Sequence, residues 1–273
     1  MISAGSPKNK LFLDDPRRFI AHPSGSTFFS LQDELRGKTQ VPAQLVSGEN
    51  TAVIVVLGQS NAGNHCGGAH AASSNKVHNF NLQNGGMYLA SDPLLGATGP
   101  SGCFATFLGD KLIADGRYQR VILAPMSINA TLASDWAAAG VFSQNIRVMC
   151  RRLAASGLPP TMVLYHQGES DNAEGTSAAT ITAALRSMVD VFRSEGVTAP
   201  VFIALASTWA GYSNNAAVRA GQAAAVNGGL GIYQGPDTDT IGPAYRDSVH
   251  FLATGSQMHA DLWASTIVSH FGL

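Results

Sequence analysis

The fold of this chain is decided by the stretch Ala52-Val53-Ile54-Val55-Val56-Leu57-Gly58-Gln59-Ser60-Asn61. Six apolar, mostly β-branched residues end abruptly in Gly-Gln-Ser-Asn, which predicts a strand buried on both faces of a parallel sheet and then a tight turn. Ligands bind at the carboxyl edge of such sheets, so Ser60 is a candidate functional residue. The Ala- and Gly-rich residues 62–72 predict a helix whose N-terminal N–H groups face the serine. The alternative is that Ser60 and Asn61 only cap this helix.

Further apolar runs follow this strand, and longer amphipathic segments separate them. Strands are predicted at 121–126, 161–166 and 200–205, with a weaker one at 230–233. Helices are predicted at 103–114, 144–155, 176–194, 216–226 and 253–271. This alternation predicts an α/β fold, a three-layer α/β/α sandwich with a central, mostly parallel sheet.

Residues 1–50 differ from the rest of the chain. Proline, glycine and charged residues interrupt them, and they contain no long periodic segment, although a short helix is expected near residues 31–36. We expect residues 1–50 to be an N-terminal extension that wraps the main domain, which residues 51–273 form.

The composition excludes several classes of function. Apolar residues make up 45% of the chain, charged residues 13%, and the net charge is −1, so disorder is not expected and nothing favours nucleic acid or an anionic membrane as a partner. No apolar run is long enough to span a bilayer, and the start of the chain lacks the apolar core of a signal peptide. We therefore expect a cytoplasmic protein or a trimmed secreted form that binds a neutral or weakly charged small ligand. No cofactor is expected.

Three cysteines are too few for a disulfide framework. Cys66 and Cys103 each lie near a candidate active-site turn and could be close in space. A disulfide between them and a pair of buried thiols both remain open.

A second candidate motif, Asp247-Ser248-Val249-His250, precedes the last predicted helix. An aspartate three residues before a histidine can accept the imidazole Nδ1–H, which leaves Nε2 free to take a proton from a serine hydroxyl. Ser60, His250 and Asp247 therefore form a candidate catalytic triad. The same spacing also occurs for purely structural reasons.

Candidate donors for an oxyanion lie in three places. The Ser60 N–H is one, a glycine of Gly99-Pro100-Ser101-Gly102 is another, and the side-chain amide of Gln167 is the third. The alternative is that the glycine loop caps the following helix and that Gln167 only ties loops together.

Four blocks, taken together, resemble the SGNH (GDSL-like) hydrolase superfamily in order and spacing. The blocks are Gly58-Gln59-Ser60-Asn61, Gly99-Pro100-Ser101-Gly102, His166-Gln167-Gly168-Glu169-Ser170-Asp171 and Asp247-Ser248-Val249-His250-Phe251. The Gly-Gln-Ser-Asn and Gln-Gly-Glu-Ser forms are similar to the sialate O-acetylesterase branch, which includes carbohydrate esterase family six. The resemblance covers residues 51–273. It implies that Ser60 is the nucleophile, His250 the general base and Asp247 its orienting carboxylate.

The resemblance also implies an oxyanion hole. Its glycine falls on Gly102, with Gly99 as the alternative. Many members of the superfamily carry an asparagine in a Gly-x-Asn-Asp block, whereas here Gln167 occupies that place and becomes the expected third donor. Glu169 matches a motif residue and is expected to anchor the surrounding loops.

The implied function is removal of O-acetyl groups from a carbohydrate, as in sialate O-acetylesterases or acetylxylan esterases. Substrate contacts are expected from five residues, of which the two tryptophans are suited to stacking on sugar rings: Gln59, Asn61, Trp136, Glu169 and Trp209. The alternative for the tryptophans is packing of loops against the core.

Three other functions compete with this one. The same triad could prefer longer acyl chains, as lipase-like or thioesterase relatives do, or the chain could be a carbohydrate-binding relative without catalysis. A metal-dependent hydrolase using His65, His70 and His78 is disfavoured because their spacings match no compact ligand signature. No metal site is expected.

Overall fold

The computed structural model describes residues 31–273 and is built on an eight-stranded sheet with the order β1-β4-β3-β5-β2-β6-β7-β8. The strands are Gln40–Val41 (β1), Thr51–Gly58 (β2), Val77–Phe80 (β3), Met87–Leu89 (β4), Arg120–Ser127 (β5), Met162–His166 (β6), Val201–Leu205 (β7) and Ile232–Asp237 (β8). The strands from β3 to β8 in this order pair in parallel, while β4 is antiparallel to both β3 and β1. The predicted mostly parallel sheet is confirmed.

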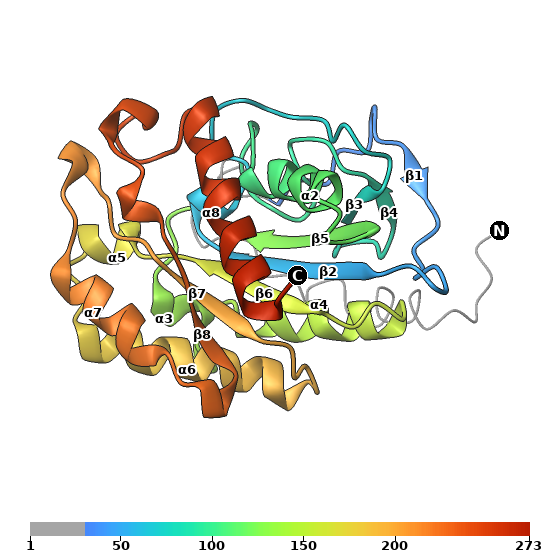
Figure 1. The fold of residues 1–273 in the computed structure, drawn as a ribbon. Helices are drawn as coiled ribbons and strands as arrows, with labels where there is room; N and C mark the ends of the chain where they lie inside the picture. Colours follow the sequence, from blue (N-terminus) through green and yellow to red (C-terminus); the bar gives the residue numbers. More distant parts are fainter. Residues whose placement is uncertain (1–30) are drawn as a thin grey trace.

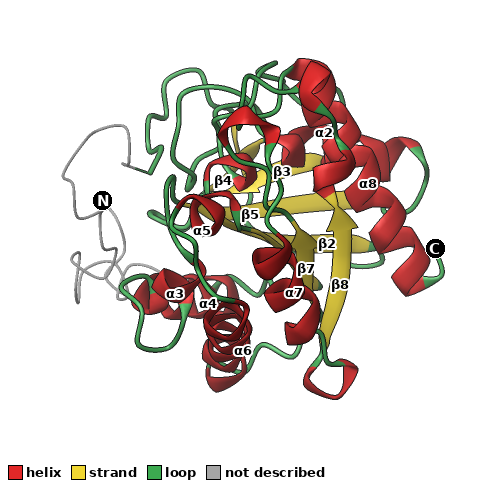
Figure 2. Ribbon diagram, turned by 90° about the vertical axis from the view of Figure 1, so that its left-hand side faces the viewer, coloured by secondary structure: helices red, strands yellow, loops and turns green. Residues whose placement is uncertain are grey.

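Helices cover both faces of the sheet, which confirms the three-layer architecture (Figures 1 and 2). On one face lie α2 (Phe104–Ala114) and α8 (Ala253–Phe271); on the other lie α4 (Ser143–Ala155), α6 (Ala178–Ser194) and α7 (Ala216–Ala225). Two short helices, α3 (Ala133–Trp136) and α5 (Glu169–Ala173), follow β5 and β6. Among the described residues, no helix combines the length and the apolar character that crossing a bilayer requires.

The central strand β2 is apolar throughout because both of its faces are buried. Its residues 53, 55 and 57 pack into the core beneath α4 and α6, and residues 52, 54 and 56 pack into the core beneath α2 and α8. Both of its edges are paired, with β5 and with β6. A run without polar alternation is what such a position requires.

The helix predicted at residues 62–72 is wrong. Only a 3-10 turn, Ser60–Ala62, forms, and the chain then continues as loop. Backbone N–H groups that a helix would use locally bond to distant segments instead: Cys66 N–H donates to the Gly102 carbonyl at 3.0 Å and Gly67 N–H to the Phe251 carbonyl at 2.7 Å. Tertiary pairing replaces helical bonding in this glycine-containing stretch.

The short helix expected near residues 31–36 is also wrong. Gln32 runs along the loop before α2, where its N–H donates to the Ala97 carbonyl and its carbonyl accepts from Gly96, and β1 adds to the antiparallel edge of the sheet. The remainder of the expected N-terminal extension, residues 1–30, lies outside the described residues.

All three cysteines are free, buried thiols. Burial raises the pKa of the Cys66 thiol to about 12. The question left open by the sequence is thus answered in favour of separate thiols.

Candidate active site

Strand β2 places Ser60 at the carboxyl edge of the sheet, between two neighbours. The last residue of β2, Gly58, pairs with Ser127 of β5 on one side and with His166 of β6 on the other. Gly58 has a φ of 137°, and a Cβ on it would lie 1.9 Å from the His166 carbonyl oxygen. Only glycine lets the strand pass so close to β6, and the turn that follows presents Ser60, which is 2% exposed.

Asn61, the residue after Ser60, joins this turn to the loop that carries His250. Its Nδ2 donates to the Val249 carbonyl at 3.1 Å, and its Oδ1 accepts from the Phe251 N–H at 3.3 Å. The residues on either side of His250 are thus both bonded to the residue next to Ser60. The structure brings these two segments together across 190 positions of sequence.

His250 and Asp247 lie in one tight loop. The Asp247 carboxylate accepts the backbone N–H of His250 at 3.0 Å, and its Oδ1 lies 3.7 Å from the imidazole Nδ1. The Asp247 side chain is 55% exposed and that of His250 28% exposed. The pair is therefore close, with the imidazole partly open to solvent.

A second imidazole lies beside the first. The ring of His65 stacks on that of His250 with centroids 5.7 Å apart, and its Nε2 lies 3.1 Å from Thr98 Oγ1. Burial, together with the nearby His250, lowers the pKa of His65 to about 4, so this ring is neutral near pH 7. The sequence shows a histidine five residues after Ser60, but its spacing from His70 and His78 suggests only the disfavoured metal-ligand role.

The two candidate oxyanion glycines differ in whether their N–H is free. The N–H of Gly102 donates to the Cys66 carbonyl at 2.8 Å, so the expected role of Gly102 does not fit this structure. The N–H of Gly99 has no hydrogen-bond partner within residues 31–273. Gly99 has a φ of 100°, and a Cβ there would lie 2.4 Å from the Asn64 carbonyl oxygen and 2.7 Å from His65 Cδ2. The alternative glycine is the better candidate.

The amide of Gln167 is occupied inside the protein. Its Nε2 donates to Gln59 Oε1 at 2.8 Å and contacts the Thr131 carbonyl and Asp171 Oδ2, while its Oε1 accepts from the Thr131 hydroxyl at 3.0 Å. This arrangement matches the loop-tying alternative and leaves no N–H for an oxyanion.

Asn129 offers an amide at the same edge of the sheet. It follows β5, and its backbone N–H donates to Thr98 Oγ1 at 2.9 Å, which places it beside the Gly99 loop. Its side chain is half-buried and has no hydrogen-bond partner in the described part of the chain. The sequence signal was its position two residues past the end of a strand that neighbours β2.

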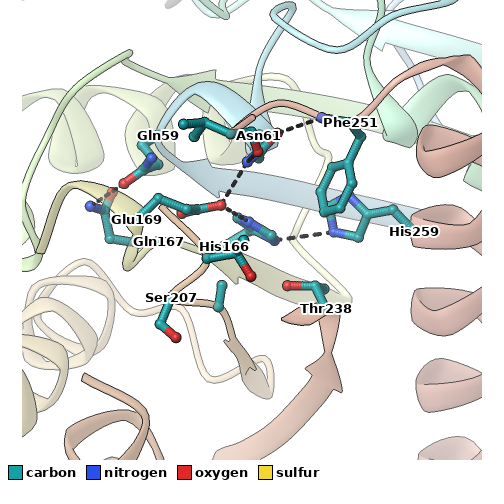
Figure 3. A network of polar contacts seen from close by, with 12 residues as sticks. Gln59, Asn61, His166, Gln167, Glu169, Ser207, Thr238, Phe251 and His259 are labelled. Atoms are coloured by element: carbon teal, nitrogen blue, oxygen red, sulfur yellow. Dashed lines mark hydrogen bonds and ion pairs between the residues drawn. The ribbon is translucent and has the colours of Figure 1, made fainter. Parts of the chain in front are cut away.

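Three of the five expected substrate contacts are buried and bonded to other protein groups. Gln59, Asn61 and Glu169 are 1%, 0% and 1% exposed. Gln59 accepts from Gln167, and the Glu169 carboxylate lies between Asn61 Nδ2 and His166 Nε2, each at 2.7 Å (Figure 3). These side chains position loops, as expected for Glu169, and do not face a substrate.

The two tryptophans also differ. Trp136 is fully buried, donates from Nε1 to Thr131 Oγ1 at 3.1 Å and packs on Phe142, so the expectation that it contacts a sugar is wrong. Trp209 lies half-buried in the loop after β7, where its backbone N–H donates to the Ser213 carbonyl. Trp209 remains a candidate for stacking.

The histidines of the metal alternative have separate partners. His65 contacts His250, while His70 Nε2 lies 2.7 Å from Asp110 and His78 lies 3.2 Å from Arg120. Residues 31–273 contain no group of three or more histidine, cysteine or acidic side chains placed to hold a metal ion.

Residues 50–268 match the family described as "Carbohydrate esterase, sialic acid-specific acetylesterase". No curated protein matches the sequence. A structure of a protein from Arabidopsis thaliana is similar with a TM-score of 0.64 at 15% identity, covering 82% of this chain and 100% of that one.

Two further solved structures share the fold. A carbohydrate acetylesterase from Xanthomonas citri has a TM-score of 0.56 at 17% identity and covers 80% of this chain and 55% of its own. A putative GDSL-like lipase from Parabacteroides merdae has a TM-score of 0.52 at 15% identity, covering 78% of this chain and 94% of its own. Because this family model matches residues 50–268, most of the sequence, the chain belongs to the sialic acid-specific acetylesterase family of carbohydrate esterases.

Proposed function

We propose that this protein is a serine esterase that removes O-acetyl groups from carbohydrates, with Ser60 as nucleophile, His250 as general base and Asp247 as its orienting carboxylate. One observation carries this proposal: Asn61 is bonded to the backbone on both sides of His250. A strand-end serine and a histidine paired with an aspartate are the parts that an acyl-transfer site needs.

The first half of the reaction forms an acetyl-enzyme. Ser60 Oγ attacks the ester carbonyl carbon while its proton passes to His250 Nε2. The tetrahedral oxyanion then accepts hydrogen bonds from the backbone N–H groups of Ser60 and Gly99. We assign the third donor to the Asn129 side chain, since the amide of Gln167 is already bonded. When the intermediate collapses, the C–O bond to the sugar breaks and the sugar oxygen takes the proton from His250.

The second half releases acetate. Water attacks the acetyl carbonyl, His250 accepts the water proton, and the bond to Ser60 Oγ breaks as Ser60 regains a proton from the imidazolium. The neutral ring of His65, stacked on His250, supports the orientation of the base without adding a second positive charge to the site.

The test of this mechanism is the Ser60→Ala variant. Its release of acetate from a chromogenic acetyl ester should fall at least about 10³-fold, because the nucleophile is lost. The control is Ser265→Ala, which changes an exposed serine on α8 and should leave the rate unchanged. Parent-like activity in Ser60→Ala would refute the mechanism.

A fluorophosphonate probe separates the esterase from a non-catalytic binding relative, because only an activated Ser60 becomes labelled. Comparing C2 with C8 esters then tests the preference for acetyl over longer acyl chains. A panel of acetylated sialoglycans and acetylated xylan identifies the sugar.

A further inference from the structure

A chain of buried hydrogen bonds runs from Asn61 through Glu169 and His166 to His259 (Figure 3). His166, at the end of β6, has its Nε2 2.7 Å from Glu169 Oε1 and its Nδ1 3.1 Å from His259 Nε2. Trp263 Nε1 lies 2.9 Å from the same His259 nitrogen. All four side chains are at most 1% exposed, so solvent does not satisfy any of these groups.

The donors and acceptors of this chain fix where its protons lie. An indole N–H can only donate, so His259 Nε2 must be an unprotonated acceptor. His166 Nδ1 faces the same nitrogen at 3.1 Å, where two unprotonated nitrogens would repel each other, so it carries a proton and shares the single lone pair of His259 Nε2 with the Trp263 N–H. His166 Nε2 faces a carboxylate and must carry one as well. With protons on both nitrogens, His166 is an imidazolium.

The surrounding charges agree with this assignment. Burial alone would raise the pKa of Glu169, but the charge and hydrogen bond of His166 and the hydrogen bond from Asn61 hold it at about 2. Burial, followed by the positive charges of His166 and Arg246, places the pKa of His259 well below its usual range. His259 is therefore neutral with its proton on Nδ1, an atom that has no partner among the described residues.

The other buried cation nearby is not the partner of Glu169. The guanidinium of Arg246 donates to the Ile241, Thr238 and Val249 carbonyls and lies 4.0 Å from the centre of the Phe251 ring. Its bond to the Val249 carbonyl stabilises the loop of His250.

We propose that His166 and Glu169 form an imidazolium–carboxylate pair whose role is to orient Asn61, and through it to align the Ser60 turn with the His250 loop. The Asn61 amide has no alternative orientation, because Oδ1 accepts from Phe251 while Nδ2 donates to both Val249 and Glu169. Both residues of the pair are positioning residues. The catalytic consequence rests on the proposed esterase function.

A neutral amide cannot replace the carboxylate. In Glu169→Gln, the amide atom that replaces Oε1 faces two groups, the Asn61 Nδ2–H and His166 Nε2. The Asn61 N–H needs an acceptor at this position. A His166 that has lost its charge keeps its proton on Nδ1, opposite His259, and presents Nε2 as an acceptor. One amide atom cannot serve both, so one of the two hydrogen bonds is lost.

The protonation state is tested on the unaltered protein by nitrogen-15 NMR of labelled histidines. The His166 signals, assigned by their loss in His166→Gln, should show both ring nitrogens protonated at pH 7.5, and those of His259 only Nδ1. An unprotonated nitrogen on His166 would overturn the assignment. This readout does not depend on esterase activity and stands even if the proposed function fails.

The positioning role is tested by kinetics. In Glu169→Gln, kcat for a chromogenic acetyl ester should fall about tenfold or more with little change in KM, and the His166 signals should become those of a neutral ring. The control, Glu195→Gln, removes a half-buried carboxylate that pairs with Arg147 and Arg151 after α6, and it should alter neither readout. If Glu169→Gln is folded, still uses Ser60 as its nucleophile and keeps the parent kcat, the positioning role of Glu169 is overturned.

Discussion

At the scale of single residues, Gly99 is a proposed oxyanion donor that would act through its backbone N–H. In Gly99→Ala the new Cβ meets the Asn64 carbonyl and the His65 ring, and the left-handed φ is strained. We expect the free energy of unfolding to fall by about 2 kcal/mol and kcat by about tenfold or more, since the oxyanion donor moves. Chemical denaturation and acetate release measure the two effects.

The matched control for that substitution is Gly157→Ala. Gly157 also has a positive φ, of 65°, but a Cβ there meets nothing within 4 Å. It should show the conformational cost of about 1 kcal/mol without any loss of kcat. If both variants kept the parent rate, the Gly99 N–H would not be an oxyanion donor.

His65 predicts a dependence of stability on pH. Its pKa is about 4 in the folded protein and near 6.5 when unfolded, so between these values the unfolded chain binds more protons and stability falls as pH decreases from 6.5 to 4. His65→Gln should take up about one proton fewer on unfolding near pH 5. Urea denaturation from pH 4 to 7 measures this slope, and identical slopes in the two proteins would contradict the assignment. Asp92, whose pKa burial raises to about 6, acts in the opposite sense in both proteins and cancels from the comparison.

The candidate site could be predicted in part. Ser60 and His250 were paired from sequence because each follows or precedes a recognisable element, and the triad they form with Asp247 stays a prediction. Gly102 and Gly99 could not be separated, because the difference depends on a bond from Gly102 to Cys66 that only the tertiary structure reveals.

At the scale of elements, the buried strands and long helices were predictable, since each has a strong apolar pattern. The short strands β3, β4 and β1 were missed because two to four residues carry too little periodicity, and their pairing is set by neighbours distant in sequence. The helix expected after Ser60 failed for the converse reason: local propensity favoured it, and long-range backbone pairing prevented it.

The start of α7 allows a test at this scale. Asn215 caps the helix, with its Oδ1 accepting from the N–H groups of Ala217 and Val218 at 2.9 and 3.2 Å. Asn215→Ala should lower the free energy of unfolding by about 1 kcal/mol. Asn215→Asp keeps the accepting oxygen and should lose less, because it forfeits only the bond from Nδ2 to Asn172. If urea titration gave the same loss of unfolding free energy for Asn215→Ala and Asn215→Asp, the helix cap would not be the cause of the loss.

At the scale of the whole molecule, loops that are far apart in sequence meet at the carboxyl edge of one parallel sheet. For this reason the predicted fold class was enough to place Ser60 and His250 in one hypothesis. The fold class did not predict which side chains along that edge are exposed and which are buried. Trp136 and Trp209 both follow strands, yet one is sealed inside the core and the other is half-buried.

The hydrogen bonds of Asn61 to Val249 and Phe251 also have a consequence for biosynthesis. A ribosome makes the serine turn long before the segment that Asn61 binds. Until that segment emerges, Ser60 of a nascent chain lacks its proposed base, His250. The proposed hydrolysis therefore cannot begin before residues 247–251 have been translated.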